Sequence, residues 1–155
     1  MRNKGFTLIE VITAAFIVTI GVLGVYSMTQ RIIRSTSYSA NQLTATYLAQ
    51  EGIEIVRNMR DTQIINSGSW TVPNGNYRAD YNDQNLSAFG GNPLLKSSGD
   101  FYNYDSGIPT IYSRRINIAN TPSFIQVTVY VNWTERGETH QVEVQENLYD
   151  WTLGG

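Results

Sequence analysis

The sequence predicts an α+β fold in which one long N-terminal helix, membrane-spanning in its first half, packs on a C-terminal antiparallel β-sheet of three or four strands. Residues 6–25 hold a single charge, that of Glu10. Residues 45–59 repeat apolar side chains at helical spacing. Residues 110–149 instead alternate apolar and polar side chains, which is the period of a strand. A helix laid on one face of a sheet buries both apolar surfaces.

The composition limits the classes of function. The chain has 155 residues, a formal net charge of −2 and no cysteine. A chain of this length, with part of it in a membrane, has room for one soluble domain. A net charge near zero gives no overall attraction to nucleic acid or anionic lipid. Without cysteine there is no disulfide, no cysteine-ligated metal and no thiol catalysis.

The apolar N-terminal stretch has the length of a membrane span. A helix over residues 6–25 would be ~30 Å long, which matches the hydrocarbon core of a bilayer. Glu10 lies near the start of that stretch, where a carboxylate is costly and calls for a partner. Basic residues both precede and follow the span, so the positive-inside rule alone does not settle its orientation.

The span begins with a family motif, Lys4-Gly5-Phe6-Thr7-Leu8-Ile9-Glu10. This segment resembles the processing and methylation motif of type IV prepilins and of type II secretion pseudopilins. In that family a dedicated peptidase cuts after the glycine and N-methylates the new first residue. The resemblance implies cleavage between Gly5 and Phe6 and methylation of Phe6. It also implies that Glu10 meets the terminal amine of a neighbouring subunit, the partner that its charge calls for.

The resemblance also implies a pilin-like organisation of the chain. Residues 1–5 would be the leader peptide, and residues 6–28 the transmembrane and assembly helix. Residues 29–60 would continue the helix into the soluble domain, and residues 61–155 would form a loop-rich region and the sheet. The expected function is that of a structural subunit, a minor pilin of a type IV pilus. The alternatives are a pseudopilin of a type II secretion system and a single-pass, membrane-anchored binding module that does not polymerise.

The partners expected from the resemblance are other pilin subunits, the prepilin peptidase and the inner-membrane pilus assembly platform, with membrane lipid around the helix before assembly. The precursor would cross the inner membrane once with its soluble domain outside the cytoplasm, and would then enter a pilus or pseudopilus. DNA is a less favoured partner, because strand alternation sends Arg114 and Arg115 to opposite faces.

An ordinary secretory signal peptide is the main alternative for the N-terminus. Such a signal has an apolar core of ~7–15 residues followed by a small-residue cleavage site. Here the core is longer, and Gly21 and Gly24 are not followed by an Ala-x-Ala pattern. A charge inside the core also argues against a signal peptide, so the prepilin interpretation is preferred.

Helical periodicity continues beyond the membrane span. The predicted apolar stripe consists of Ala45, Leu48, Gly52, Ile55, Val56 and Met59. Glu54 and Arg57 lie off the stripe and can pair at i, i+3. Turn residues then dominate residues 61–110, where we expect loops with one or two short strands and the specificity of this particular protein.

A hairpin closes the sequence. If Arg136-Gly137 is a two-residue loop, the cross-strand pairs are Val131–Val142, Val129–Val144 and Ile125–Leu148. The same register places Glu146 on the apolar face opposite Val127, and His140 opposite Trp133. Only the turn is doubtful, because arginine disfavours the positive φ of a type I′ turn.

No residue pattern indicates an enzyme, so no catalytic residue, metal site or cofactor is expected. The single histidine, His140, is expected to have a packing or surface role. Oxygen-bearing side chains cluster at Asp80, Asn82, Asp83 and Asn85, without the spacing and glycine of an EF-hand. The cluster is expected to be a solvated turn.

Overall fold

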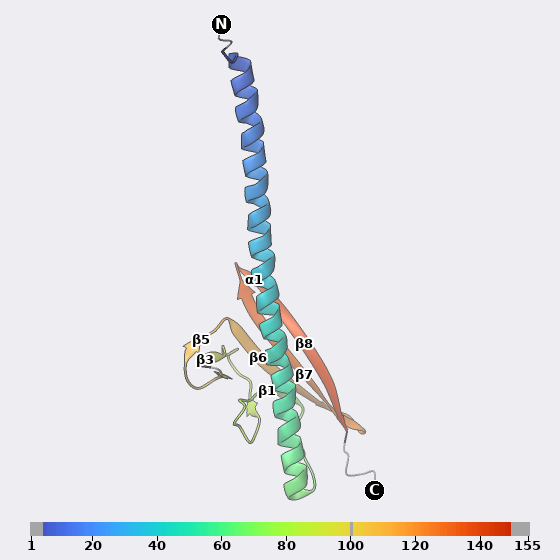
Figure 1. Ribbon diagram of the computed structural model, residues 1–155. Coiled ribbons are helices and arrows are strands. Elements are labelled where there is room, and N and C mark those ends of the chain that lie inside the picture. The colour runs from blue at the N-terminus through green and yellow to red at the C-terminus, as the bar shows by residue number, and fades with distance from the viewer. Residues whose placement is uncertain (1–4, 100, 150–155) are drawn as a thin grey trace. The chain divides into compact units, whose positions relative to one another are not determined.

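The structure, a computed structural model, describes residues 5–99 and 101–149. The chain divides into two compact units, residues 1–40 and residues 41–155. Helix α1 (Leu8–Ser67) contributes to both units, and eight strands follow it in the sequence (Figure 1). The α+β fold class is confirmed.

The first unit contains the start of α1, which is the one helix of the described chain long and apolar enough to cross a membrane. Its apolar side chains are exposed, including Phe16 and Val25. Its threonine hydroxyls are satisfied internally: Thr13 donates to the carbonyl of Ile9 at 2.9 Å, and Thr19 to that of Ala15 at 2.8 Å. This arrangement suits a helix surrounded by hydrocarbon, where unsatisfied polar groups are costly.

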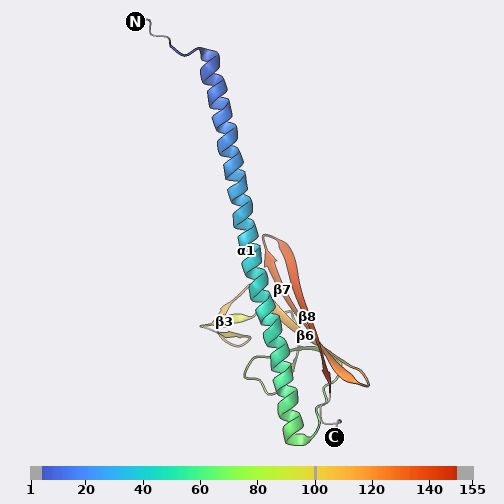
Figure 2. The same cartoon turned by 45° about the vertical axis from the view of Figure 1, so that its right-hand side comes forward.

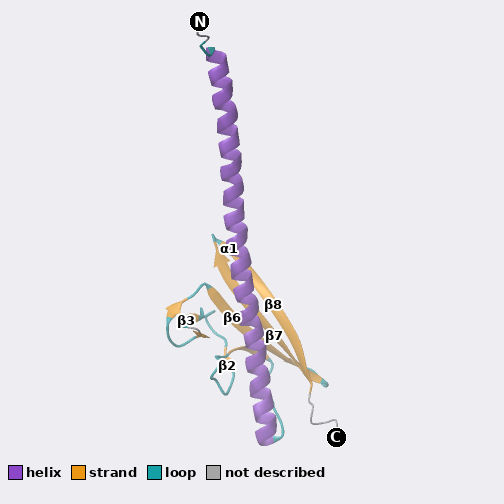
Figure 3. Ribbon diagram, in the orientation of Figure 1, coloured by secondary structure: helices purple, strands orange, loops and turns teal. Residues whose placement is uncertain are grey.

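The second unit contains two antiparallel sheets (Figure 3). The larger has the order β2-β1-β6-β7-β8, and the smaller has the order β4-β3-β5. The strands of the larger sheet are β1 (Gly75–Arg78), β2 (Ser87–Ala88), β6 (Tyr112–Asn120), β7 (Phe124–Glu135) and β8 (Glu138–Tyr149). Those of the smaller sheet are β3 (Lys96–Ser98), β4 (Phe101–Asn103) and β5 (Ile108–Pro109).

The prediction of three or four strands was wrong in number, because the main sheet has five. The extra strands come from the turn-rich region, where β1 pairs with β6 and the two-residue β2 pairs with β1. Strands this short show too little alternation to be recognised from their side chains. Of the two, only β1 pairs directly with the long strand β6, and β2 pairs with β1.

The hairpin of β7 and β8 has the predicted register. Val131 faces Val142, Val129 faces Val144 and Ile125 faces Leu148. Arg136 and Gly137 form the loop with φ values of 55° and 86°, both positive as a type I′ turn requires. The arginine therefore adopts a backbone conformation that its side chain disfavours, because the register of two long strands determines the turn.

The end of α1 packs on the main sheet, as Figures 1 and 2 both show for its green part. All members of the predicted apolar stripe are buried. At Gly52 the helix approaches the sheet closely, since a Cβ added there would lie 2.9 Å from Cγ1 of Val129 on β7. The helix continues past residue 60, the predicted end, because no breaker occurs before Gly68. There a φ of 76° and an N–H bond to the carbonyl of Ile64 at 2.8 Å end the helix.

Candidate functional site

The N-terminal motif leads directly into the first turn of α1. Gly5 lies outside the helix, and a Cβ added there would meet nothing within 4 Å. Phe6 is 83% exposed, and helix α1 begins at Leu8. The peptide bond between Gly5 and Phe6 therefore lies in an uncrowded, non-helical segment. Backbone of this kind can enter the extended cleft of a peptidase without unfolding a helix.

The carboxylate of Glu10 caps its own helix. Its Oε2 accepts from the backbone N–H of Thr7 at 3.3 Å and from the Thr7 hydroxyl at 3.4 Å. The hydroxyl oxygen of Thr7 in turn accepts from the backbone N–H of Glu10 at 3.4 Å. This is a capping box, in which Ser or Thr at the N-cap and Glu three residues later satisfy each other's backbone donors. The Thr-x-x-Glu pattern could have predicted it, but sequence reasoning considered only the charge of Glu10.

Within residues 5–99 and 101–149, the charge of Glu10 has no counter-ion. None of the ion pairs formed by the described residues involves this carboxylate. The positive end of the helix dipole stabilises a carboxylate in the first turn, but only partly. Glu10 thus lies among exposed apolar side chains such as Leu8 and Val11, with its carboxylate hydrogen-bonded to Thr7.

A family model, the prokaryotic N-terminal methylation motif, matches residues 1–26. The chain carries a prepilin-type N-terminus. Comparison with curated proteins and with solved structures gives no match. The motif supports a type IV prepilin-like protein that a peptidase processes and that assembles with other subunits. Proteins with this motif are structural rather than catalytic. The motif and the apolar helix also fit a precursor anchored in the inner membrane.

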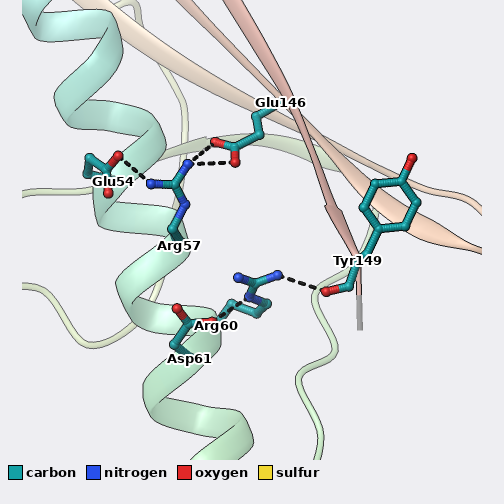
Figure 4. A network of polar contacts seen from close by, with 6 residues as sticks. All are labelled: Glu54, Arg57, Arg60, Asp61, Glu146 and Tyr149. Carbon is teal, nitrogen blue, oxygen red and sulfur yellow. Dashed lines mark hydrogen bonds and ion pairs between the residues drawn. The ribbon is translucent and has the colours of Figure 1, made fainter. Parts of the chain in front are cut away.

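In the second unit, an ion-pair network joins α1 to β8 (Figure 4). Arg57 donates to Glu54 at 2.5 Å, as predicted, and to both oxygens of Glu146 at 2.5 and 2.6 Å. Bonding to Glu146 is the largest of the effects that raise the pKa of Arg57, although burial opposes the rise. Glu146 faces Val127, as predicted. Its carboxylate is tolerated on the apolar face because it is hydrogen-bonded to the Arg57 guanidinium.

A buried cation on β6, Arg114, was missed as such by sequence reasoning. Arg114 on β6 has no exposed side-chain surface. It donates to the carbonyl of Leu48 at 3.2 Å, to Glu51 at 3.0 Å and to the carbonyl of Ala79 at 2.9 Å. The sequence did contain a signal for this burial, because Arg114 occupies a position at which the alternation of its strand places apolar side chains. Arg114 therefore connects the helix, the sheet and the segment after β1.

The oxygen-rich cluster is only partly the predicted solvated turn. Asn82, Asp83 and Asn85 are exposed, but Asp80 is only 3% exposed, which corrects the prediction for that residue. Asp80 accepts from the backbone N–H of Tyr104 at 3.0 Å. Burial raises the pKa of Asp80, the bond from Tyr104 opposes the rise, and the nearby charge of Asp83 adds to it. In residues 5–99 and 101–149, no group of three His, Asp or Glu side chains could hold a metal ion.

The single histidine packs against an aromatic neighbour. The His140 and Trp133 rings lie 5.3 Å apart between centroids, opposite each other on β8 and β7. This agrees with the predicted packing or surface role.

The neighbouring arginines of β6 lie on opposite faces of the strand, as alternation predicts. Arg114 is buried in the core, while the Arg115 guanidinium lies 4.6 Å from the centre of the Tyr130 ring.

Proposed function

We propose that the chain is a minor pilin that is matured by a prepilin peptidase and assembled through its N-terminal helix. Residues 1–5 are the leader, residues 6–28 the transmembrane and assembly helix, residues 29–60 its continuation, and residues 61–155 the loop-rich region and sheet. Cleavage after Gly5 makes Phe6 the methylated N-terminus. The observation that carries the proposal is the methylation motif, matched over residues 1–26, which leads into an exposed apolar helix.

Glu10 is proposed as the assembly residue. Its hydrogen bonds to Thr7 lower the cost of placing a carboxylate at the end of an apolar helix, but they leave its charge uncompensated. A terminal ammonium from a neighbouring subunit would compensate it. The exposed apolar faces of the same helix would then exchange lipid for helix packing inside a filament.

The first test is the intact mass and N-terminal sequence of the membrane-bound protein, co-expressed with an active prepilin peptidase. The expected product starts at a methylated Phe6 and lacks residues 1–5. Gly5→Val should block cutting, because a branched side chain crowds the scissile peptide. An uncut wild-type chain, beside a control prepilin that is cut, would overturn the proposed maturation and leave a membrane-anchored module.

The second test separates the charge of Glu10 from its capping role. Glu10→Gln keeps an oxygen that can accept from Thr7 but removes the charge, whereas Thr7→Val removes the hydroxyl of the cap and keeps the charge. We expect the glutamine variant to remain in the membrane and to be absent from sheared fibres, while the valine variant still enters them. Normal assembly of Glu10→Gln would show that the charge is dispensable and would contradict the proposed pairing.

A further inference from the structure

A groove in the second unit is rich in amide side chains. One hollow of about 550 Å³ lies between α1 and the loop after β1. A second hollow of about 180 Å³ lies between the same loop and the strands β3 and β4. Tyr81 and Asn82 line both hollows, so the two hollows lie next to each other at these side chains. We call this surface the amide groove; its principal residues are Asn58, Asn66, Tyr81, Asn82, Gln84 and Asn85.

An aromatic platform lies where the hollows meet. Tyr81 stacks on Phe101 with ring centroids 4.9 Å apart and an interplanar angle of 23°. The two residues are nevertheless 54% and 56% exposed. Stacking fixes the orientation of the Tyr81 ring, while its exposure leaves apolar surface in contact with water. A flat, fixed aromatic face of this kind is complementary to the C–H face of a pyranose ring.

Unused hydrogen-bonding groups surround the platform. The side chains of Asn66, Asn82 and Gln84 make no hydrogen bond within the described part of the chain, and all three residues are exposed. Each amide offers two donors and a carbonyl acceptor. Sugar hydroxyls both donate and accept, so a row of amides can satisfy neighbouring hydroxyls on one ring. The size of the larger hollow is within the ~300–1,000 Å³ typical of small-molecule sites.

The charges of the groove select against anionic ligands. Neither hollow is lined by a lysine or an arginine. In the larger hollow the carboxylates are already in use: Glu51 accepts from Arg114, Glu54 accepts from Arg57, and Asp83 accepts from the backbone N–H of Asp80. The smaller hollow adds the carboxylate of Asp105. A phosphate, sulfate or uronic acid would find no counter-charge here. In the larger hollow, a strongly cationic ligand would have to compete with Arg114 for Glu51 and with Arg57 for Glu54.

We propose that the amide groove binds a neutral saccharide chain, with one pyranose ring stacked on Tyr81 and hydroxyl or acetamido groups bonded to Asn82 and Gln84. The aromatic platform supplies apolar contact, the amides supply the hydrogen bonds, and the missing lysine and arginine exclude acidic glycans. The proposal does not depend on polymerisation, because every residue that carries it lies within the second unit.

The test uses the full chain in lipid nanodiscs, since maltoside detergents would themselves present sugar to the groove. Calorimetric titration compares four probes: N,N′,N″-triacetylchitotriose, cellotriose, trigalacturonic acid and trilysine. We expect at least one of the two neutral trisaccharides to bind in preference to the acidic one and to trilysine. The two neutral probes distinguish an acetamido polymer, as in cell walls, from a plain hexose polymer.

Variants locate the bound sugar. Tyr81→Ala should weaken binding about tenfold or more, the loss typical of truncating an aromatic anchor. Tyr149→Ala is the matched control, because Tyr149 is also exposed (58%) and also packs on a phenylalanine, Phe124, but lies outside the groove. Gln84→Ala tests the polar contacts if the tyrosine variant is unstable. No binding of neutral probes, preference for trilysine or trigalacturonate, or equal affinity of the groove variants and the control would overturn the proposal.

Discussion

The guanidinium of Arg114 shows how this interior tolerates a charge. Its Nη1 and Nη2 donate to two backbone carbonyls, those of Leu48 and Ala79, and to the carboxylate of Glu51. The hydroxyl of Tyr104 donates to the carbonyl of Arg114 itself at 2.6 Å. Removing the guanidinium would leave buried acceptors without partners. The resulting loss in the free energy of unfolding is larger than the stabilisation that the intact arrangement contributes.

Replacing Arg114 tests this account. Arg114→Met removes the donors and keeps much of the side-chain volume, so we expect a loss of about 2–3 kcal/mol in the free energy of unfolding. Urea unfolding followed by tryptophan fluorescence measures it. Arg115→Met is the control at the next position, where a ring contact with Tyr130 is worth about 0.5–1 kcal/mol. Equal losses for the two variants would contradict the assigned role of Arg114.

Asp80 should give the stability a specific pH dependence. Because burial raises its pKa, the folded chain binds the Asp80 proton more tightly than the unfolded chain does. Ionisation of Asp80 therefore destabilises the fold as the pH rises from about 4, the ordinary carboxyl value, through the folded pKa. Asp80→Asn keeps an oxygen for the N–H of Tyr104 but cannot ionise. We expect the unfolding free energy of the wild type, minus that of the variant, to fall as the pH rises across this window. Urea titrations at several pH values measure the difference, and a constant or rising difference would refute the assignment.

At the scale of elements, the β7–β8 turn shows a conflict between the backbone preference of a turn residue and the register of the two strands. Arg136 has a φ of 55°, which a non-glycine side chain disfavours, while Gly137 adopts 86° without strain. Alternation along the two strands predicted the register correctly, since a shift by one residue would turn the valines of β7 to solvent. The packing of twelve paired positions therefore outweighs one unfavourable turn residue.

Changing the turn residues should separate these effects. Arg136→Asn places a residue that tolerates positive φ, and we expect a gain of about 0.5–1 kcal/mol in unfolding free energy. Gly137→Ala should lose about 1 kcal/mol, because alanine is strained at this φ. Arg136→Lys is the neutral control, with the same charge and the same backbone preference as arginine. Thermal unfolding followed by circular dichroism compares the three, and destabilisation by asparagine would contradict the turn assignment.

At the scale of the whole molecule, sequence reasoning succeeded wherever a long periodic pattern existed. The apolar stripe of α1 and the register of β7 and β8 were predictable, because in each of them the same spacing of apolar side chains repeats over many residues. The short strands β1 to β5 were not, since two to four residues carry no period. The amide groove was also out of reach, because it joins α1 to a loop that lies fifteen or more residues further along the chain. The methylation motif was recognisable from residues alone, but its capping geometry became clear only when Thr7 and Glu10 were seen together.

The larger sheet has an edge strand that bears on contacts between copies of the chain. Strand β8 ends the sheet, and within the described chain its outer row of backbone groups has no strand beside it. Such an edge is a template on which a second copy could add its own strand.

The charged side chains along β8 oppose such pairing. They are Glu138, Glu143 and Glu146, with no lysine or arginine among them. Two copies that met edge to edge would bring carboxylates together, and like charges on paired strands repel. In the described part of the chain, Glu146 forms its ion pair with Arg57 of the same chain. Crowded neighbours are thereby kept from joining their sheets, so that their contacts are left to other surfaces.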